Sequence, residues 1–219
     1  PPARAAAGER HSLFIDGEGR LSSCGSAAEG EEDEEEDWEE FPGLLGHGEG
    51  VLQLKTPTRL PSLPGGERAI GVAASYFFSL ALSANGALWS WGSGDKGKLG
   101  HGDEEDQWQP KKIEAFAGQR VVAVSAGGMH SLALTADGGV CSWGDGNDGR
   151  LGHGNREGQL LPKKIEALAG KRVVAVSAGG MHNLALTADG GVCSWGDGND
   201  GRLGHGNREG QLLPKKIEA

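Results

Sequence analysis

The sequence predicts an all-β fold made of four copies of one small unit, and three observations support this prediction. Residues 121–167 recur as residues 173–219 with a single difference, Ser131 against Asn183. The copies start at 121 and 173, which gives a period of 52 residues, and a fixed period of this size is typical of stacked supersecondary units. The segments within each copy are short, rich in β-branched residues and bounded by glycine, as strands are.

Two diverged copies precede these, so the whole chain is repetitive. Residues 89–92 align with 141–144, and Leu-Gly-His-Gly stands at 45–48, 99–102, 151–154 and 203–206. We divide the single domain, residues 1–219, into repeats 1–68, 69–120, 121–172 and 173–219.

The third repeat predicts its elements in order. We expect strands over 121–126, 129–135 and 140–144, with a tight turn at 136–138, where Asp-Gly tolerates the positive φ of a short hairpin. A glycine-rich loop follows at 145–150. Residues 162–167 fit either a short helix or an outer edge strand. We favour the edge strand, because proline at its start and lysines along it suit an edge.

The inner strands are apolar on both faces. Val121, Val122 and Val124 do not alternate with polar residues, which indicates that both faces of the sheet are covered. Four-stranded antiparallel blades that stack around an axis meet this demand, whereas a helical solenoid requires a 3.6-residue period that is missing. The predicted fold is a partial β-propeller of about four blades.

The charge is concentrated in one segment. The formal net charge is −10, but residues 29–40 hold ten acids and no base, which leaves 21 acids against 21 bases elsewhere. Such a balance lacks the basic stripe of nucleic-acid-binding proteins, so no direct nucleic-acid partner is expected. The longest apolar stretch, 71–84, is too short to cross a bilayer, so no membrane partner is expected.

Three cysteines do not make a disulfide framework. Cys141 and Cys193 occupy the same position of successive repeats, so they are expected to lie one repeat apart. Together with the lack of a secretory signal, this favours a reduced intracellular setting, cytoplasmic or nuclear.

The repeated text 127–146 followed by Gly149-Arg150-Leu151-Gly152-His153-Gly154 resembles the regulator-of-chromosome-condensation repeat. The resemblance covers nearly the whole chain and implies a seven-bladed propeller, of which this chain would supply four blades. The chain begins at Pro1 without methionine and stops inside its last repeat, so we expect a fragment. Its uncovered apolar faces are expected to cause self-association.

Trp91, Trp143 and Trp195 recur at the repeat period and are expected to pack between blades. The plant UV-B photoreceptors that resemble this family sense light through a Gly-Trp-Arg-His-Thr motif. That motif aligns with residues 127–131, where Gly128 takes the place of the essential tryptophan, so photoreception is not expected.

Histidines also recur, at 47, 101, 153 and 205, but none has a second ligand at metal-binding spacing. We expect them to bond to loop backbone. His130 and His182 lie on an apolar strand where Phe78 replaces them in the second repeat, which indicates packing and hydrogen bonding. No catalytic, phosphate-binding or cofactor-binding arrangement is present, so the sequence predicts a non-enzyme without metal or cofactor.

The acidic segment 29–40 is an insertion between the third strand and the Leu-Gly-His-Gly turn of the first repeat. It is either a solvated loop of like charges or a docking arm for a basic partner with Trp38 as its apolar anchor. Trp108, which replaces Leu160 in what the sequence suggests is a loop, is a further candidate. The candidate partner-binding residues are Asp33, Glu34, Glu35, Trp38 and Trp108.

Three functions remain open. We favour a non-catalytic protein–protein interaction scaffold. The resemblance also implies two alternatives, a guanine nucleotide exchange factor for a Ran-like small GTPase or the propeller module of a HECT-type ubiquitin ligase. In this family, exchange uses a protruding β-wedge, and the only insertion here is polyacidic and unsuited to a hairpin. The expected partner is a protein, a small GTPase or another.

Overall fold

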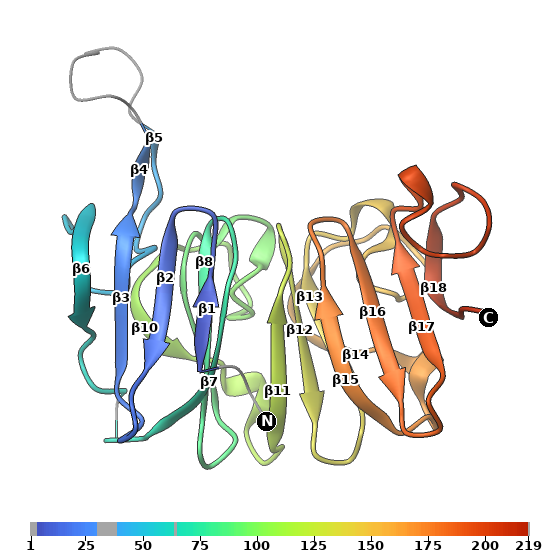
Figure 1. The fold of residues 1–219 in the computed structure, drawn as a ribbon, viewed down its shortest axis with the longest axis horizontal. Helices are drawn as coiled ribbons and strands as arrows, with labels where there is room; N and C mark the ends of the chain where they lie inside the picture. The colour runs from blue at the N-terminus through green and yellow to red at the C-terminus, as the bar shows by residue number, and fades with distance from the viewer. Residues whose placement is uncertain (1–3, 30–38, 64, 219) are drawn as a thin grey trace.

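The computed structural model describes residues 4–29, 39–63 and 65–218, and they form four antiparallel sheets that stand side by side (Figure 1). Each sheet has four strands and is built from one repeat, which confirms the predicted all-β propeller of antiparallel blades. No helix within these described ranges is both long and apolar enough to span a bilayer.

The strand bounds repeat from blade to blade. Blade one contains β1 (Ala5–Ala7), β2 (His11–Ile15), β3 (Leu21–Ser26) and β6 (Gln53–Arg59). Blade two contains β7 (Ala69–Ala74), β8 (Phe78–Ser83), β9 (Leu88–Gly92) and β10 (Gln107–Lys112). Blade three contains β11 (Val121–Ala126), β12 (His130–Thr135), β13 (Val140–Gly144) and β14 (Gln159–Lys164). Blade four contains β15 (Val173–Ala178), β16 (His182–Thr187), β17 (Val192–Gly196) and β18 (Gln211–Lys216).

Shorter elements connect these strands. A separate two-stranded ribbon pairs β4 (Ala28–Glu29) with β5 (Glu39–Glu40). Turns of 3-10 helix follow the third strands at η1 (Asp95–Gly97), η3 (Asn147–Gly149) and η5 (Asn199–Gly201), and others follow the fourth strands at η2 (Glu114–Phe116) and η4 (Glu166–Leu168).

The outer strand of blade three differs from its predicted bounds. It begins at Gln159 rather than Pro162, and Glu166–Leu168 forms the 3-10 turn η4, so residues 165–167 are not strand. The turn arises because Ile165 and Leu168 are both buried, which bends the chain over the bottom of the blade. Pro162 lies where the register between β13 and β14 shifts, a bulge where its missing N–H costs no ladder bond.

The core lies between successive blades rather than inside any one of them. One cluster joins Leu80 and Leu82 of blade two to Val121 and Trp143 of blade three. A second joins Leu132 of blade three to Trp195 and its neighbours in blade four. This face-to-face packing explains why the inner strands carry apolar residues on both sides.

The first strands lie closest to the propeller axis, and β11 packs against both β7 and β15. The two ends of the blades form two faces. The upper face, at the top in Figure 1, carries the loops between first and second strands and the long connections from third to fourth strands. The lower face carries the hairpins between second and third strands and the links between blades, at 60–68, 113–120 and 165–172.

Candidate protein-interaction surface

The repeated tryptophans are buried between each blade and the blade before it, as expected. Trp143 is fully buried, and its Nε1 donates a hydrogen bond to the carbonyl of Lys98 in blade two at 2.9 Å. Trp195 makes the same bond to Arg150 at 3.0 Å. A Cβ at Gly100 would lie 2.8 Å from the indole Nε1 of Trp143, so the glycine of the Leu-Gly-His-Gly turn makes room for the ring.

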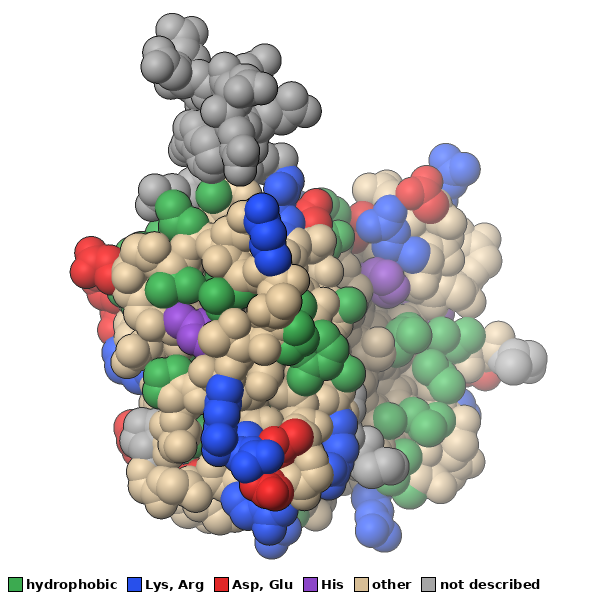
Figure 2. All heavy atoms as spheres, turned by 60° about the vertical axis from the view of Figure 1, so that its left-hand side comes forward, with side chains coloured by type: hydrophobic (Ala, Val, Ile, Leu, Met, Phe, Trp, Pro, Cys, Tyr) green, Lys and Arg blue, Asp and Glu red, His purple; other side chains and the backbone are tan. Residues whose placement is uncertain are grey.

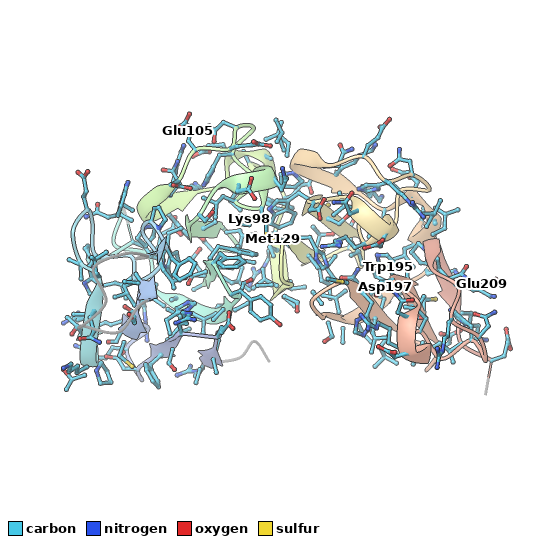
Figure 3. All side chains as sticks on the ribbon, turned by 90° about the horizontal axis from the view of Figure 1, so that it is seen from above. Lys98, Glu105, Met129, Trp195, Asp197 and Glu209 are labelled. Atoms are coloured by element: carbon cyan, nitrogen blue, oxygen red, sulfur yellow. The ribbon has the colours of Figure 1, made fainter. Side chains whose placement is uncertain are left out.

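Two cations of the upper face, Lys98 and Arg150, stabilise its turns. Lys98 is 1% exposed, and its Nζ donates to Ser93 Oγ at 2.9 Å and to the Asp95 carbonyl at 3.1 Å. Burial lowers its pKa to about 8. Arg150 takes the same repeat position in blade three and pairs with Asp145 at 3.1 Å. These charges are committed to the protein itself, whereas Glu105 and Glu209 lie at the outer rim when the face is seen from above (Figure 3).

Aromatic side chains gather on the upper face where blades one and two meet. The Phe41 and Phe77 rings have centroids 5.5 Å apart, and Tyr76 beside them is 49% exposed. Met181 is 47% exposed at the repeat position of Phe77. Sequence analysis missed Tyr76, although it stands at the repeat position of Gly128 and could have been found by aligning the second repeat to the UV-B motif.

Four of the candidate partner-binding residues, Asp33, Glu34, Glu35 and Trp38, lie outside the described residues. The structure does show where their segment starts and ends. Ala28 pairs with Glu40 and Glu29 with Glu39, and this β4–β5 ribbon projects from the upper face beyond blade one (Figure 1). The expectation that the insertion is unsuited to a hairpin is therefore wrong at its base, where the backbones pair in antiparallel register.

Trp108, the fifth candidate, lies in strand β10 and not in a loop. It falls in the bulge of that strand, because the register with β9 shifts between Gln107 and Lys111. Its carbonyl accepts a hydrogen bond from Gly48 N at 3.0 Å, which ties it to the turn of blade one. The half-buried indole lines a shallow hollow of about 600 Å³ with Glu49, Trp89 and Pro110.

The loop histidines contact serine side chains, and His153 and His205 also bond to the serine backbone, so the expected backbone bonding is joined by a side-chain partner. His101 Nε2 lies 2.9 Å from Ser90 Oγ, while Ser90 Oγ donates its proton to the Leu99 carbonyl at 2.8 Å. The histidine must therefore donate to the serine, so it cannot act as a base toward it. Burial, followed by the charge of Lys111, lowers the pKa of His101 to about 4, which keeps it neutral.

The strand histidine of blade three packs and hydrogen-bonds as expected. His130 is fully buried and its Nε2 lies 2.6 Å from Asn183 Oδ1 in blade four. Across 4–29, 39–63 and 65–218, no group of three or more His, Cys, Asp or Glu residues is placed to hold a metal ion. Cys141 is buried, and burial raises the pKa of its thiol to about 11.

The lower face carries basic residues at repeated positions, which sequence analysis overlooked although their period is visible. The links between blades supply Arg68, Arg120 and Arg172, and the ends of the fourth strands supply Arg59, Lys112, Lys164 and Lys216. Figure 2 shows Lys and Arg side chains gathered with acidic ones at the lower end of one side of the molecule.

Residues 3–219 match the family described as the RCC1-like domain. The chain belongs to this family. It is 39% identical over its whole length to the human E3 ubiquitin-protein ligase HERC2 and spans 4% of that protein. It is 40% identical over 176 residues to the ultraviolet-B receptor UVR8 of Arabidopsis thaliana, a match covering 80% of this chain and 40% of the receptor.

The fold matches solved propellers of the same family. Yeast RCC1 (Prp20), in its crystal structure with Kap60, superposes with a TM-score of 0.78 at 27% identity, covering 98% of this chain and 48% of the yeast protein. The chain therefore spans less than half the length of each of these three proteins.

Proposed function

We propose that this RCC1-like domain is a non-catalytic scaffold for protein–protein interactions, and that its acidic upper-face insertion docks a basic partner. The observation that supports the proposal most is the separation of the β4–β5 ribbon from the sheet of blade one. That sheet is complete as β1-β2-β3-β6, so the insertion adds an acidic arm without taking part in the blade.

The non-catalytic part of the proposal rests on the chemistry of the repeated side chains. The Ser–His pairs repeat identically, and in each the serine proton is directed to a leucine carbonyl, at 2.8 Å for Ser90 and 2.6 Å for Ser142. Such pairs stabilise turns and supply no activated nucleophile. An intracellular site, cytoplasmic or nuclear, is part of the same proposal, and the three free cysteines are compatible with it.

The test compares capture of basic proteins by the 219-residue chain and by a variant in which residues 29–40 are replaced by a Gly-Ser linker. Exposed charges are screened beyond about 8 Å at physiological ionic strength, so arm-dependent capture should fall steeply with salt. We expect the variant to lose salt-dependent partners and to keep the melting temperature of the parent. Identical partner sets and identical salt slopes would refute the docking role.

Guanine nucleotide exchange on a Ran-like GTPase is a second candidate, and the projecting β4–β5 ribbon favours it because exchange in this family uses a protruding hairpin. An exchange factor accelerates nucleotide release by binding the nucleotide-free GTPase more tightly. Release of a fluorescent nucleotide from Ran, measured with the chain and with the arm-replaced variant, decides between the two roles. The module of a HECT-type ligase is a special case of the scaffold, supported by the 39% identity to HERC2.

A further inference from the structure

Two hollows on the lower face repeat the same arrangement one blade apart. The third-blade hollow, of about 450 Å³, is lined by the link residues Gln119 and Arg120, the hairpin residue Asp137 and Lys164 at the end of β14. The fourth-blade hollow, of about 340 Å³, is lined by the corresponding residues and has one more cation: Lys171, Arg172, Asp189 and Lys216.

The aliphatic part of the arginine side chain in each hollow packs against a hairpin glycine of the preceding blade. A Cβ at Gly86, in the hairpin of blade two, would lie 2.5 Å from Arg120 Cγ, so the stem lies directly on that glycine. A Cβ at Gly138 would lie 3.3 Å from Arg172 Cγ. These contacts position the two stems while their guanidinium groups stay exposed.

In the described part of the chain, the cations of the hollows make no close ion pair, although Lys164 and Lys216 lie near enough to Asp137 and Asp189 to help lower the pKa of these carboxyls. Among the residues that the structure describes, no ion pair involves Arg120, Lys164, Arg172 or Lys216. The corresponding arginine of the first link behaves differently, because Arg68 Nε donates to the Glu18 carbonyl at 2.7 Å. The guanidinium groups of blades three and four are therefore available to a ligand.

The aspartate that lines each hollow already accepts hydrogen bonds from residues of its own hairpin. Asp137 Oδ1 accepts hydrogen bonds from Thr135 Oγ1 at 2.5 Å and from Gly139 N at 3.3 Å, and the Thr135 bond is the main cause of its lowered pKa. Asp189 makes the same bonds with Thr187 and Gly191. Counting side-chain charges, the third-blade hollow keeps an excess of one positive charge and the fourth-blade hollow an excess of two.

We propose that the paired lower hollows bind an extended acidic segment of a partner protein, with one carboxylate side chain entering each hollow. An arginine opposite a lysine suits a carboxylate, because guanidinium bonds it in bidentate fashion while the ammonium adds a point charge. Facing sheets lie about 10 Å apart and an extended chain advances about 3.3 Å per residue, so acids roughly three residues apart would reach both hollows.

A protein segment fits this surface better than a nucleic acid does. The hollows are separate, each has an aspartate in its wall, and the whole chain carries a net charge of −10, which opposes a continuous polyanion. This inference rests on the proposed scaffold role and names the chemistry of one partner. The lower face would bind an acidic segment while the acidic arm on the opposite face binds a basic one.

The test measures fluorescence anisotropy of a fluorescein-labelled twelve-residue oligo-glutamate titrated with the 219-residue chain in 150 mM salt. The variants are R120Q/K164Q for the third-blade hollow and R172Q/K216Q for the fourth. The matched control is K163Q/K215Q, which removes two charges from the same strands, one residue away on the opposite faces. Thermal melts verify that all variants fold.

We expect each hollow variant to weaken oligo-glutamate binding at least tenfold and the control to change it less than threefold. Equal weakening by the control, or no binding by the parent chain, would overturn the proposal. Binding of a dT12 oligonucleotide as tight as that of oligo-glutamate would also overturn it in favour of a nucleic-acid site. Because the arm-replaced variant keeps both hollows, failure here is distinguishable from failure of the scaffold proposal.

Discussion

His130 Nε2 donates a hydrogen bond to Asn183 Oδ1 across the boundary between blades three and four, at 2.6 Å. The direction follows from the amide, because Asn183 Nδ2 already donates to the Arg150 carbonyl at 2.7 Å and only Oδ1 remains to accept. His130 therefore carries a proton on Nε2, and burial, which lowers its pKa to about 4, keeps the ring neutral. The single difference between the two 47-residue copies, Ser131 against Asn183, lies at this contact.

The two residues at this position of the interface differ from one blade boundary to the next. His11 Nε2 lies 2.7 Å from Ser79 Oγ between blades one and two. Between blades two and three, Phe78 takes the place of the histidine, and Ser131 Oγ donates to the Lys98 carbonyl at 2.9 Å instead. The chain thus contains His–Ser, Phe–Ser and His–Asn pairs, and it lacks the combination of phenylalanine with asparagine.

We predict that His130→Phe, which creates that missing combination, lowers the free energy of unfolding by about 1–3 kcal/mol. The reason is that Asn183 Oδ1 would be buried without a donor. Adding Asn183→Ser recreates the Phe78–Ser131 pair and should restore most of the loss. Urea unfolding of the parent, both single variants and the double variant gives the coupling energy as a double-mutant cycle. Additive effects of the two substitutions would contradict this account.

Acid should destabilise the domain through the same histidine. Burial lowers the pKa of His130 to about 4 from an ordinary value of 6.5. The unfolded chain therefore binds a proton between these values that the folded chain does not, so stability is full above pH 6.5 and falls as pH decreases toward 4.

The His130→Phe/Asn183→Ser variant lacks this group, so its stability should fall less steeply with pH. The difference in slope should be about 1.4 kcal/mol per pH unit between pH 6 and 4.5, the value for one proton. Urea midpoints collected at pH 7, 6, 5 and 4.5 measure both slopes. His11, whose pKa burial also lowers to about 4, titrates in both proteins and cancels. Parallel pH profiles for the two proteins would rule out His130 as a source of acid sensitivity.

Truncation of the buried and half-buried tryptophans should have unequal effects. Trp143→Ala removes a fully buried indole and its bond to the Lys98 carbonyl, so we expect a loss of about 3–5 kcal/mol. Trp108 is half-buried at the edge of a sheet, and Trp108→Ala should cost about 1 kcal/mol or less. Chemical melts of the two variants make the comparison, and similar losses would show that Trp108 supports the contact between blades one and two.

The sequence was sufficient to predict the blades, because glycines lie at or near the ends of the inner strands of the third repeat and the repeat occurs four times. It did not predict which side chains meet across blade boundaries, since His130 and Asn183 belong to different repeats and only the stacking of sheets brings them together. The end of β14 was misplaced for a similar reason, because burial of Ile165 against its neighbours ends the strand.

Surface sites were harder to predict than the core. The basic positions of the lower face recur at the repeat period, but their grouping into hollows depends on the path of the blade links over the hairpins. Trp108 was placed in a loop because a bulge interrupts the alternation by which a strand is recognised. The proposed role of the acidic arm still rests on its composition and on the pairing at its base.

The last prediction uses the near-identity of blades three and four. Leu134 and Leu186 occupy the same position in the repeated text, yet Leu134 is 3% exposed and Leu186 is 38% exposed, because blade four covers only the former. Leu134→Ala should therefore cost about 2–5 kcal/mol and Leu186→Ala less than about 1 kcal/mol. Val174, at 46% exposed, lies on the same blade as Leu186, and an apolar face of this kind favours association. We expect light scattering to show self-association of the chain that Leu186→Ser reduces. Equal losses of stability for the two alanine variants in a monomeric chain would show that neighbouring blades contribute little to burial at this position.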